Sequence, residues 1–346
     1  MTAAAATQRA TRMVESVHRD AIDPAALVAA DKPVIVRGFV NDWPLVEAGR
    51  RGVGDAISYL KHFYSGRPVV GYTGLPENGG RYFYEAGATG LNYNSERVAL
   101  DVYLDRIAER LGDPASPSFY VGSTDLDQFL PGISAENSLK LDDVAFGCRP
   151  PTVSIWLGNR TTAPTHYDQS NNIACCAIGR RRFTLFPPEQ VANLYPGPLE
   201  PTPGGQVVSM VDLRAPDFDL YPRFADALES AQVAELEPGD ILFYPALWWH
   251  QVEALDPFNA MINYWWDVSP AFMDTPQTTL LHAILSLRDR PDSEKAAWRN
   301  LFDYYVFGPA DQAAAHLPEP AQGALGRLDD IKARRLRAAI IHKINR

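Results

Sequence analysis

The sequence of 346 residues has few of the features that mark secreted or membrane proteins. It contains only three cysteines, and two of them, Cys175 and Cys176, are adjacent. A disulfide framework needs an even and spaced set, so the pattern predicts a protein of a reducing compartment. No apolar run reaches the roughly 18 residues that a membrane-spanning helix needs.

The sequence also has fewer basic residues than acidic ones. Lysine and arginine number 32 against 42 acidic residues, which gives a formal net charge of −10. An acidic surface repels phosphate backbones, so nucleic acid is a disfavoured partner. Residues 1–13 are rich in alanine and threonine and lack the apolar segment of a signal peptide. We therefore expect a frayed N-terminal end, no membrane attachment and a cytoplasmic location.

The first of three regions, about residues 14–115, has a mixed pattern. A helix-like opening precedes a short apolar strand at residues 32–38, which ends at a glycine. Residues 99–111 carry apolar side chains at helical spacing. Between them lies an aromatic segment, residues 72–84, which is either a strand of the core or part of a substrate groove.

The middle region, about residues 118–268, is predicted to be all β. Short apolar runs alternate with turns rich in glycine and proline. The expected strands are residues 152–158, 172–178, 181–186, 240–244, 248–254 and 260–266. Many short strands at this spacing favour a sandwich, a jelly roll or a small barrel. Residues 196–222, rich in proline and glycine, are predicted to be a surface insertion of the kind that is frequently functional.

The last region, residues 275–346, returns to helical periodicity. Apolar side chains recur at helical spacing in three segments, residues 280–287, 298–305 and 325–344. An amphipathic helix at the end of a chain must bury its apolar face. The sequence leaves open whether this helical region packs on the β core of the same chain or forms a dimerisation element.

The motif Thr165-His166-Tyr167-Asp168 is the first indication of chemistry. Residues i and i+2 of a strand point to the same face, so His166 and Asp168 would project together. In a chain with seven histidines a chance His-x-Asp is common, and the motif alone is a weak signal. Its position after an apolar strand that ends at Gly158 is the one expected of two ligands at the mouth of a barrel.

His250 is the best candidate for a third ligand. It lies in an expected strand beside Trp248 and Trp249, 84 residues after His166. A histidine standing alone there would be interpreted as a core residue, but with His166 and Asp168 it completes two imidazoles and one carboxylate. That set is the facial triad of non-haem iron(II) oxygenases, which leaves coordination positions open.

The open positions of such a metal would take a bidentate 2-oxo acid and dioxygen. The far carboxylate of a 2-oxo dicarboxylate needs a cation, and the fork of an arginine suits it. Alternation along the expected strand places Arg181 on one face and Arg180 and Arg182 on the other. Asn172 and Asn263 lie in neighbouring apolar strands, where an unpaired amide is costly, so we favour carboxylate binding over a purely structural role.

The runs that carry these residues resemble one known family. The segments WLG, THYD and NNIACCAIGRRRFTLFPP, the later EPGDILFYPALWWHQVEAL and NYWW, and the earlier KPVIVRGFVNDWP are similar to the cupin-like branch of the JmjC oxygenases. This branch contains the asparaginyl hydroxylase that inhibits the hypoxia-inducible factor. The resemblance covers about residues 31–268.

The resemblance implies a mainly β fold with flanking helices. Its core is a double-stranded β-helix, or jelly roll, at about residues 118–268 within a cupin-like domain at residues 14–268. The C-terminal helical region, residues 275–346, follows it, and a homodimer is implied by the family.

The resemblance also implies specific site residues. Iron(II) would be bound by His166, Asp168 and His250, and the cosubstrate 2-oxoglutarate by Tyr120, Asn172, Arg181 and Asn263. Two positions depart from the family. Arg181 replaces a usual lysine, and Ala163 replaces a usual threonine three residues before the first ligand, for which Thr162 or Thr165 are candidates to compensate.

The activity that the resemblance implies is hydroxylation of a substrate C–H bond, with conversion of 2-oxoglutarate to succinate. A protein or peptide side chain is the favoured substrate, while a small molecule or tRNA stays open. Residues 196–222 and 72–84 are the groove candidates. Two other classes also stay open: a cupin hydrolase or isomerase that uses zinc or manganese, and a non-catalytic cupin-fold binding module.

Overall fold

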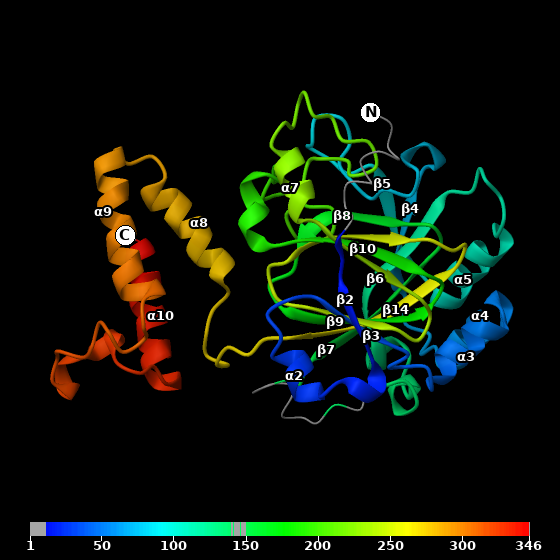
Figure 1. The fold of residues 1–346 in the computed structure, drawn as a ribbon, viewed down its shortest axis with the longest axis horizontal. Helices are drawn as coiled ribbons and strands as arrows, with labels where there is room; N and C mark the ends of the chain where they lie inside the picture. Colours follow the sequence, from blue (N-terminus) through cyan, green and yellow to red (C-terminus); the bar gives the residue numbers. More distant parts are fainter. Residues whose placement is uncertain (1–11, 140, 142–145, 147–149, 346) are drawn as a thin grey trace. The chain divides into compact units, whose positions relative to one another are not determined.

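The computed structural model describes residues 12–139, 141, 146 and 150–345. Its strands form two sheets (Figure 1). The smaller sheet has five strands in the order β1-β11-β10-β13-β8, and the larger has nine in the order β2-β3-β12-β9-β14-β7-β6-β4-β5. The chain divides into two compact units between Asp267 and Val268.

Eight consecutive strands build the core of the first unit. They are β7 (Thr152–Gly158), β8 (Thr162–Tyr167), β9 (Asn171–Ile178), β10 (Arg181–Phe186), β11 (Gln232–Leu236), β12 (Ile241–Tyr244), β13 (Trp249–Ala254) and β14 (Asn259–Trp266). Four of them, β8, β10, β11 and β13, lie in the smaller sheet and the other four in the larger. This division of eight antiparallel strands between two facing sheets is a jelly roll, so the predicted fold class is confirmed.

Strand β9 is buried almost throughout because both faces of its sheet are covered. Cys176 belongs to the cluster between the two sheets, whereas Cys175 belongs to a second cluster on the outer face. Burial raises the pKa of the Cys176 thiol to about 12, as expected of a small apolar strand residue without a catalytic role. The third cysteine, Cys148, lies outside the described residues.

Helices cover the outer face of the larger sheet. The helices α3 (Pro44–Arg51), α4 (Val53–His62) and α5 (Leu100–Glu109) supply Leu45, Leu60 and Leu104 to the outer cluster. Figure 1 shows these three helices together on one side of the unit. Apart from the first two strands, the remaining elements before β7 are η1 (Arg19–Ala21), α2 (Pro24–Val28), β3 (Val34–Arg37), β4 (Val69–Gly74), η2 (Pro76–Asn78), β5 (Tyr93–Val98), β6 (Ser118–Asp125), α6 (Leu126–Phe129) and η3 (Ile133–Ala135).

The start of the described chain differs from the prediction. The expected frayed end falls mostly on residues 1–11, which lie outside the described residues, but Arg12–Met13 forms strand β1. The helix-like opening is correct only in part, because Glu15–His18 forms strand β2 and the helical turns η1 and α2 follow it before β3. Both strands pair in parallel, β1 with the distant β11 and β2 with the following strand β3, and local periodicity carries no information about such pairing.

The proline- and glycine-rich stretch is more than a surface insertion. It lies between η5 (Pro188–Ala192) and α7 (Phe224–Ser230) and packs on the smaller sheet. Val207, Val208 and Val211 are buried. The backbone N–H of Ser209 donates to the carbonyl of Thr165 at 2.7 Å, which fastens the stretch beside strand β8.

The second unit is helical, as predicted, with α8 (Pro276–Leu287), α9 (Asp292–Phe302), η6 (Asp303–Phe307), η7 (Glu319–Ala321), η8 (Gly323–Leu325) and α10 (Asp330–Ile344). Arg337 of α10 forms an ion pair with Asp274 at 2.8 Å. Within the described part of this unit only three alanines and Gly326 are buried, while large apolar side chains such as Leu285 and Phe307 are 81% and 75% exposed.

The turn between β9 and β10 generates a stability prediction. Gly179 has φ of +69°, and a Cβ atom there would lie 2.6 Å from the carbonyl oxygen of Phe258. We expect Gly179→Ala to lower the free energy of unfolding by more than the roughly 1–2 kcal/mol of left-handed strain. Gly66→Ala, with φ of +80° and open space around it, is the matched control. Equal losses in chemical denaturation would contradict the contact.

Candidate metal centre

The centre is built on the antiparallel pairing of β8 with β13. In this ladder His250 lies directly opposite His166. The two imidazole rings have centroids 4.3 Å apart and an interplanar angle of 52°. Cross-strand neighbours on one face of a sheet are the closest side chains that a ladder provides. The pairing thus brings together two histidines that are far apart in the sequence.

Asp168 follows the end of β8 and completes the cluster. Its Oδ2 lies 3.7 Å from Nε2 of His250. One ligand atom from each of His166, Asp168 and His250 lies within 4.8 Å of the other two. Two imidazoles and one carboxylate at this separation can hold one transition-metal ion and leave part of its coordination sphere open.

Backbone carbonyls fix the tautomers of both histidines. Nδ1 of His166 lies 2.7 Å from the carbonyl oxygen of Pro164, and Nδ1 of His250 lies 3.0 Å from that of Trp248. A carbonyl only accepts, so Nδ1 carries the proton in each ring. Each Nε2 therefore presents a lone pair toward the cluster, which is the arrangement that metal-ligating histidines need.

The surroundings keep His250 neutral. Its side chain is 2% exposed, and burial, followed by the neighbouring His166, lowers the pKa of His250 to about 4. Asp168 and the carbonyl of Trp248 act in the opposite direction with smaller effect. A histidine with this pKa offers its lone pair throughout the neutral range.

The cluster lies in a cavity of about 420 Å³. Two of the four predicted cosubstrate residues, Tyr120 and Asn263, line this cavity with the triad, and Trp156 and Trp265 add aromatic walls. The other two, Asn172 and Arg181, are 0% and 2% exposed and are not among the residues that line the cavity.

The two asparagines bond to each other. Nδ2 of Asn263 donates to Oδ1 of Asn172 at 2.7 Å, and Nδ2 of Asn172 donates to Oδ2 of Asp168 at 3.4 Å. Oδ1 of Asn263 is buried without a partner. The predicted amides thus form a chain that ends on the carboxylate of the triad.

Arg181 is a buried cation without an acidic partner among the described residues. Its Nε has no hydrogen-bond acceptor, and burial lowers the pKa of Arg181. Its neighbours in the sequence point outward and are paired, Arg180 with Asp256 at 3.0 Å and Arg182 with Glu235 at 2.7 Å. Arg181 also lowers the pKa of Tyr120, which burial raises, so its charge acts on the cavity wall.

The predicted substitutes for the missing threonine do not reach the cavity. Ala163 lines it, but Thr162 and Thr165 are buried elsewhere and do not. Trp248, which shares the face of His250, packs in the cluster between the sheets and does not line the cavity either.

One groove candidate is corrected, and the other contributes residues to the cavity wall. Tyr82 and Tyr84 are each 5% exposed and absent from the cavity wall, so they are structural. The hydroxyl of Tyr84 donates to the carbonyl of Pro201 at 2.9 Å and helps to hold the insertion. Gly204 and Gln206 of that insertion line the cavity.

Sequence reasoning missed Tyr244. This residue ends strand β12, lines the cavity, and has its ring centroid 4.6 Å from that of His250. Tyrosine is common in apolar strands, and only the register of β12 in the larger sheet reveals that its side chain points to the triad.

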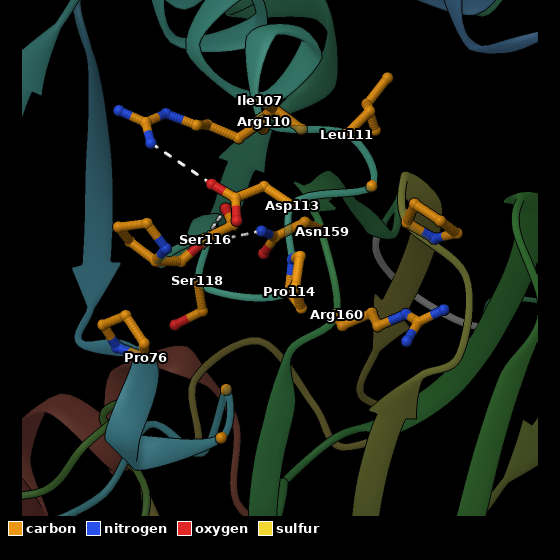
Figure 2. Close-up of a pocket in the computed structure, with 15 residues that line it drawn as sticks. Pro76, Ile107, Arg110, Leu111, Asp113, Pro114, Ser116, Ser118, Asn159 and Arg160 are labelled. Atoms are coloured by element: carbon orange, nitrogen blue, oxygen red, sulfur yellow. Dashed lines mark hydrogen bonds and ion pairs between the residues drawn. The ribbon is translucent and has the colours of Figure 1, made fainter.

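Figure 2 shows a second cavity, of about 380 Å³, between the end of α5 and the loop that contains Asn159 and Arg160. The carboxylate on its wall, Asp113, forms an ion pair with Arg110 at 3.4 Å. None of the described residues that line it is a histidine or a cysteine, so it offers no comparable metal-binding set.

Comparisons with known proteins agree with this architecture. A sequence model of the cupin-like domain family matches residues 20–272. Human HSPB1-associated protein 1 is 33% identical over 152 residues, which are 42% of this chain and 30% of that protein. Lysine-specific demethylase 8 of Xenopus tropicalis is 26% identical over 243 residues, 68% of this chain and 48% of that protein.

The name of a third relative refers to tRNA. The tRNA wybutosine-synthesizing protein 5 of Danio rerio is 33% identical over 126 residues, 36% of this chain and 33% of that protein. The chain therefore spans less than half the length of each of these three curated relatives.

The unpaired state of Arg181 generates a prediction for the unliganded protein. We expect Arg181→Met to raise its free energy of unfolding by about 1–3 kcal/mol, because an unsatisfied buried group is removed. Arg182→Met, which breaks a partly exposed ion pair, is the control and should change it by less than about 1 kcal/mol. Urea denaturation measures both. A less stable Arg181→Met protein would mean that the guanidinium has a structural partner.

Proposed function

Because this chain belongs to the cupin-like domain family, of the JmjC type, we propose that it is an iron(II)- and 2-oxoglutarate-dependent oxygenase. The observation that carries the proposal is the convergence of two imidazoles and one carboxylate in a cavity of the jelly roll. The catalytic domain would be residues 14–268, in agreement with the division of the chain after Asp267.

The described residues fit both groups. His166, Asp168 and His250 would hold the iron through two Nε2 lone pairs and a carboxylate oxygen. When bound together, iron and 2-oxoglutarate supply the activation of dioxygen, with release of succinate and carbon dioxide. Nδ1 of each histidine stays protonated against its carbonyl and keeps the ring in place.

Arg181 would bind the far carboxylate of 2-oxoglutarate. A buried guanidinium without an acidic partner is a potential binding site for an anion. Tyr120 lies close enough to Arg181 for its hydroxyl to bind the same carboxylate. Asn172 and Asn263 would order the other end of the cosubstrate next to Asp168. Arginine in place of the usual family lysine keeps the charge and presents two donor nitrogens in a planar fork for bidentate pairing.

We favour a protein or peptide side chain as the substrate. Apart from the triad, the side chains that line the cavity are uncharged, and several are polar, among them Ser123, Ser170 and Gln206. A neutral side chain that can form hydrogen bonds would suit such walls better than a charged one. The name of one relative keeps tRNA as the second candidate, against which the net charge of −10 argues.

A cytoplasmic location remains a prediction from the sequence. No helix in the described part of the chain is long and apolar enough to cross a membrane.

The class of reaction is tested by succinate formation. The iron(II)-loaded protein in air should convert 2-oxoglutarate to succinate, slowly without its substrate, and His166→Ala should reduce the rate to background because it removes a ligand. His282→Ala, on the surface of α8, is the matched control. Mass spectrometry of the acids measures the product.

Other results would favour the alternative classes. If succinate does not form and calorimetry detects no binding of 2-oxoglutarate, a hydrolase or isomerase that uses zinc or manganese becomes the leading hypothesis. If His166→Ala also leaves the cellular function intact, the chain is a non-catalytic binding module.

We further propose that the helical unit, residues 275–346, makes a homodimer. Large apolar side chains of this unit are not covered by the unit's own helices, and apolar helix faces of this kind need a packing partner, for which we propose a second copy of the unit. Light scattering at micromolar concentration should give twice the chain mass of 38.3 kDa. Leu285→Glu should lower the measured mass to that of a monomer. Leu220→Glu should not, because Leu220 lies in the first unit, where it is 63% exposed. A monomeric wild-type protein would reject the proposal.

A further inference from the structure

Tyr244 is placed on the metal-facing side of the triad. It is the last residue of β12, lies opposite Asn172 of β9, and is 2% exposed. Its hydroxyl oxygen lies 3.4 Å from Nε2 of His250. The amide of Asn263 lies against the same hydroxyl. A phenol is therefore directed at the atom of His250 that would bind a metal.

Metal binding would change what this hydroxyl can bond to. Nδ1 of His250 carries the proton, so in the metal-free protein the hydroxyl of Tyr244 donates toward the Nε2 lone pair. A metal on Nε2 uses that lone pair. The buried donor then needs another acceptor, because an unsatisfied buried hydroxyl costs free energy.

The neighbouring amides are poorly placed to serve a chelating carboxylate by themselves. Nδ2 of Asn263 is engaged by Asn172 at 2.7 Å, and Nδ2 of Asn172 is directed at Asp168. A carboxylate next to the metal has several lone pairs to satisfy. The donor that metal binding releases lies at the same place, on Tyr244.

We propose that Tyr244 is a further cosubstrate-binding residue, whose hydroxyl donates a hydrogen bond to the carboxylate of the 2-oxo acid that chelates the metal. The inference rests on the proposed function. When a metal occupies Nε2 of His250, the hydroxyl of Tyr244 loses its acceptor and can donate to the carboxylate of the acid. Binding of the metal therefore prepares the site for the acid.

Tyr244→Phe tests the inference, since it removes the hydroxyl and keeps the ring. Calorimetry without oxygen would measure the dissociation constants of iron(II) alone and of 2-oxoglutarate with the iron(II)-loaded protein. We expect 2-oxoglutarate to bind about tenfold more weakly, the lower end of the effect of losing a partner of a metal site. The affinity for iron(II) alone should change less, and the visible absorption of the iron(II)–2-oxo acid chelate should shift.

Tyr264→Phe is the matched control. Tyr264 is also buried on a core strand, but it belongs to the outer cluster, and its hydroxyl accepts from the backbone N–H of Leu139 at 3.1 Å. This variant should bind 2-oxoglutarate like the wild-type protein. Circular dichroism of both variants checks that the fold is retained.

The outcomes separate the inference from the proposed function. If wild-type protein binds 2-oxoglutarate and Tyr244→Phe binds it equally well with the same absorption, Tyr244 has no part in cosubstrate binding and the inference is overturned. If Tyr244→Phe weakens only the binding of iron(II), the inference is also overturned, because the hydroxyl would then support the metal site and not the binding of 2-oxoglutarate. If the wild-type protein itself binds no 2-oxoglutarate, the proposed function fails and the inference fails with it.

Discussion

The geometry of the candidate centre depends on one irregularity in the pairing of β8 with β13. His250 lies opposite His166, and Val252 lies opposite Ala163, so two residues of β8 face the single residue Gln251. Such a β-bulge shifts the alternation of side chains by one position. His166 and Ala163, three residues apart, can therefore both line the cavity, together with His250 and Val252. Pro164 is tolerated inside the bulge, and its carbonyl orients the ring of His166.

Local patterns in the sequence predicted much of this arrangement. The expected strand at residues 152–158 coincides with β7, and the other expected strands agree within a residue or so, because short apolar runs between turns are local signals. The spacing of His166 and Asp168 placed them on one face, and the structure brings them together with His250. Simple alternation likewise predicted that Arg181 points to the opposite side from Arg180 and Arg182.

The features that the sequence did not predict depend on contacts between distant segments. The pairing of β1 with β11 and of β2 with β3 is parallel and lies at the edges of the sheets, where a few exposed residues carry no clear period. Pro164 fits an edge strand as well as a bulge, so the sequence alone did not locate the bulge in β8, and Thr162 and Thr165 could not be rejected as substitutes for a missing threonine. Tyr244 became visible only when the register of β12 with β9 was known.

Three consecutive arginines illustrate how the fold separates stability from binding. Arg180 and Arg182 point outward and each has a carboxylate within 3.0 Å, whereas Arg181 points inward and has none among the described residues. An acid beside Arg181 would stabilise the unliganded protein, but it would neutralise the charge that an anionic ligand needs. A buried cation without an acid is therefore unfavourable for folding and favourable for binding. This conflict, within one strand of a well-packed jelly roll, argues for an anion site more strongly than the arginine by itself.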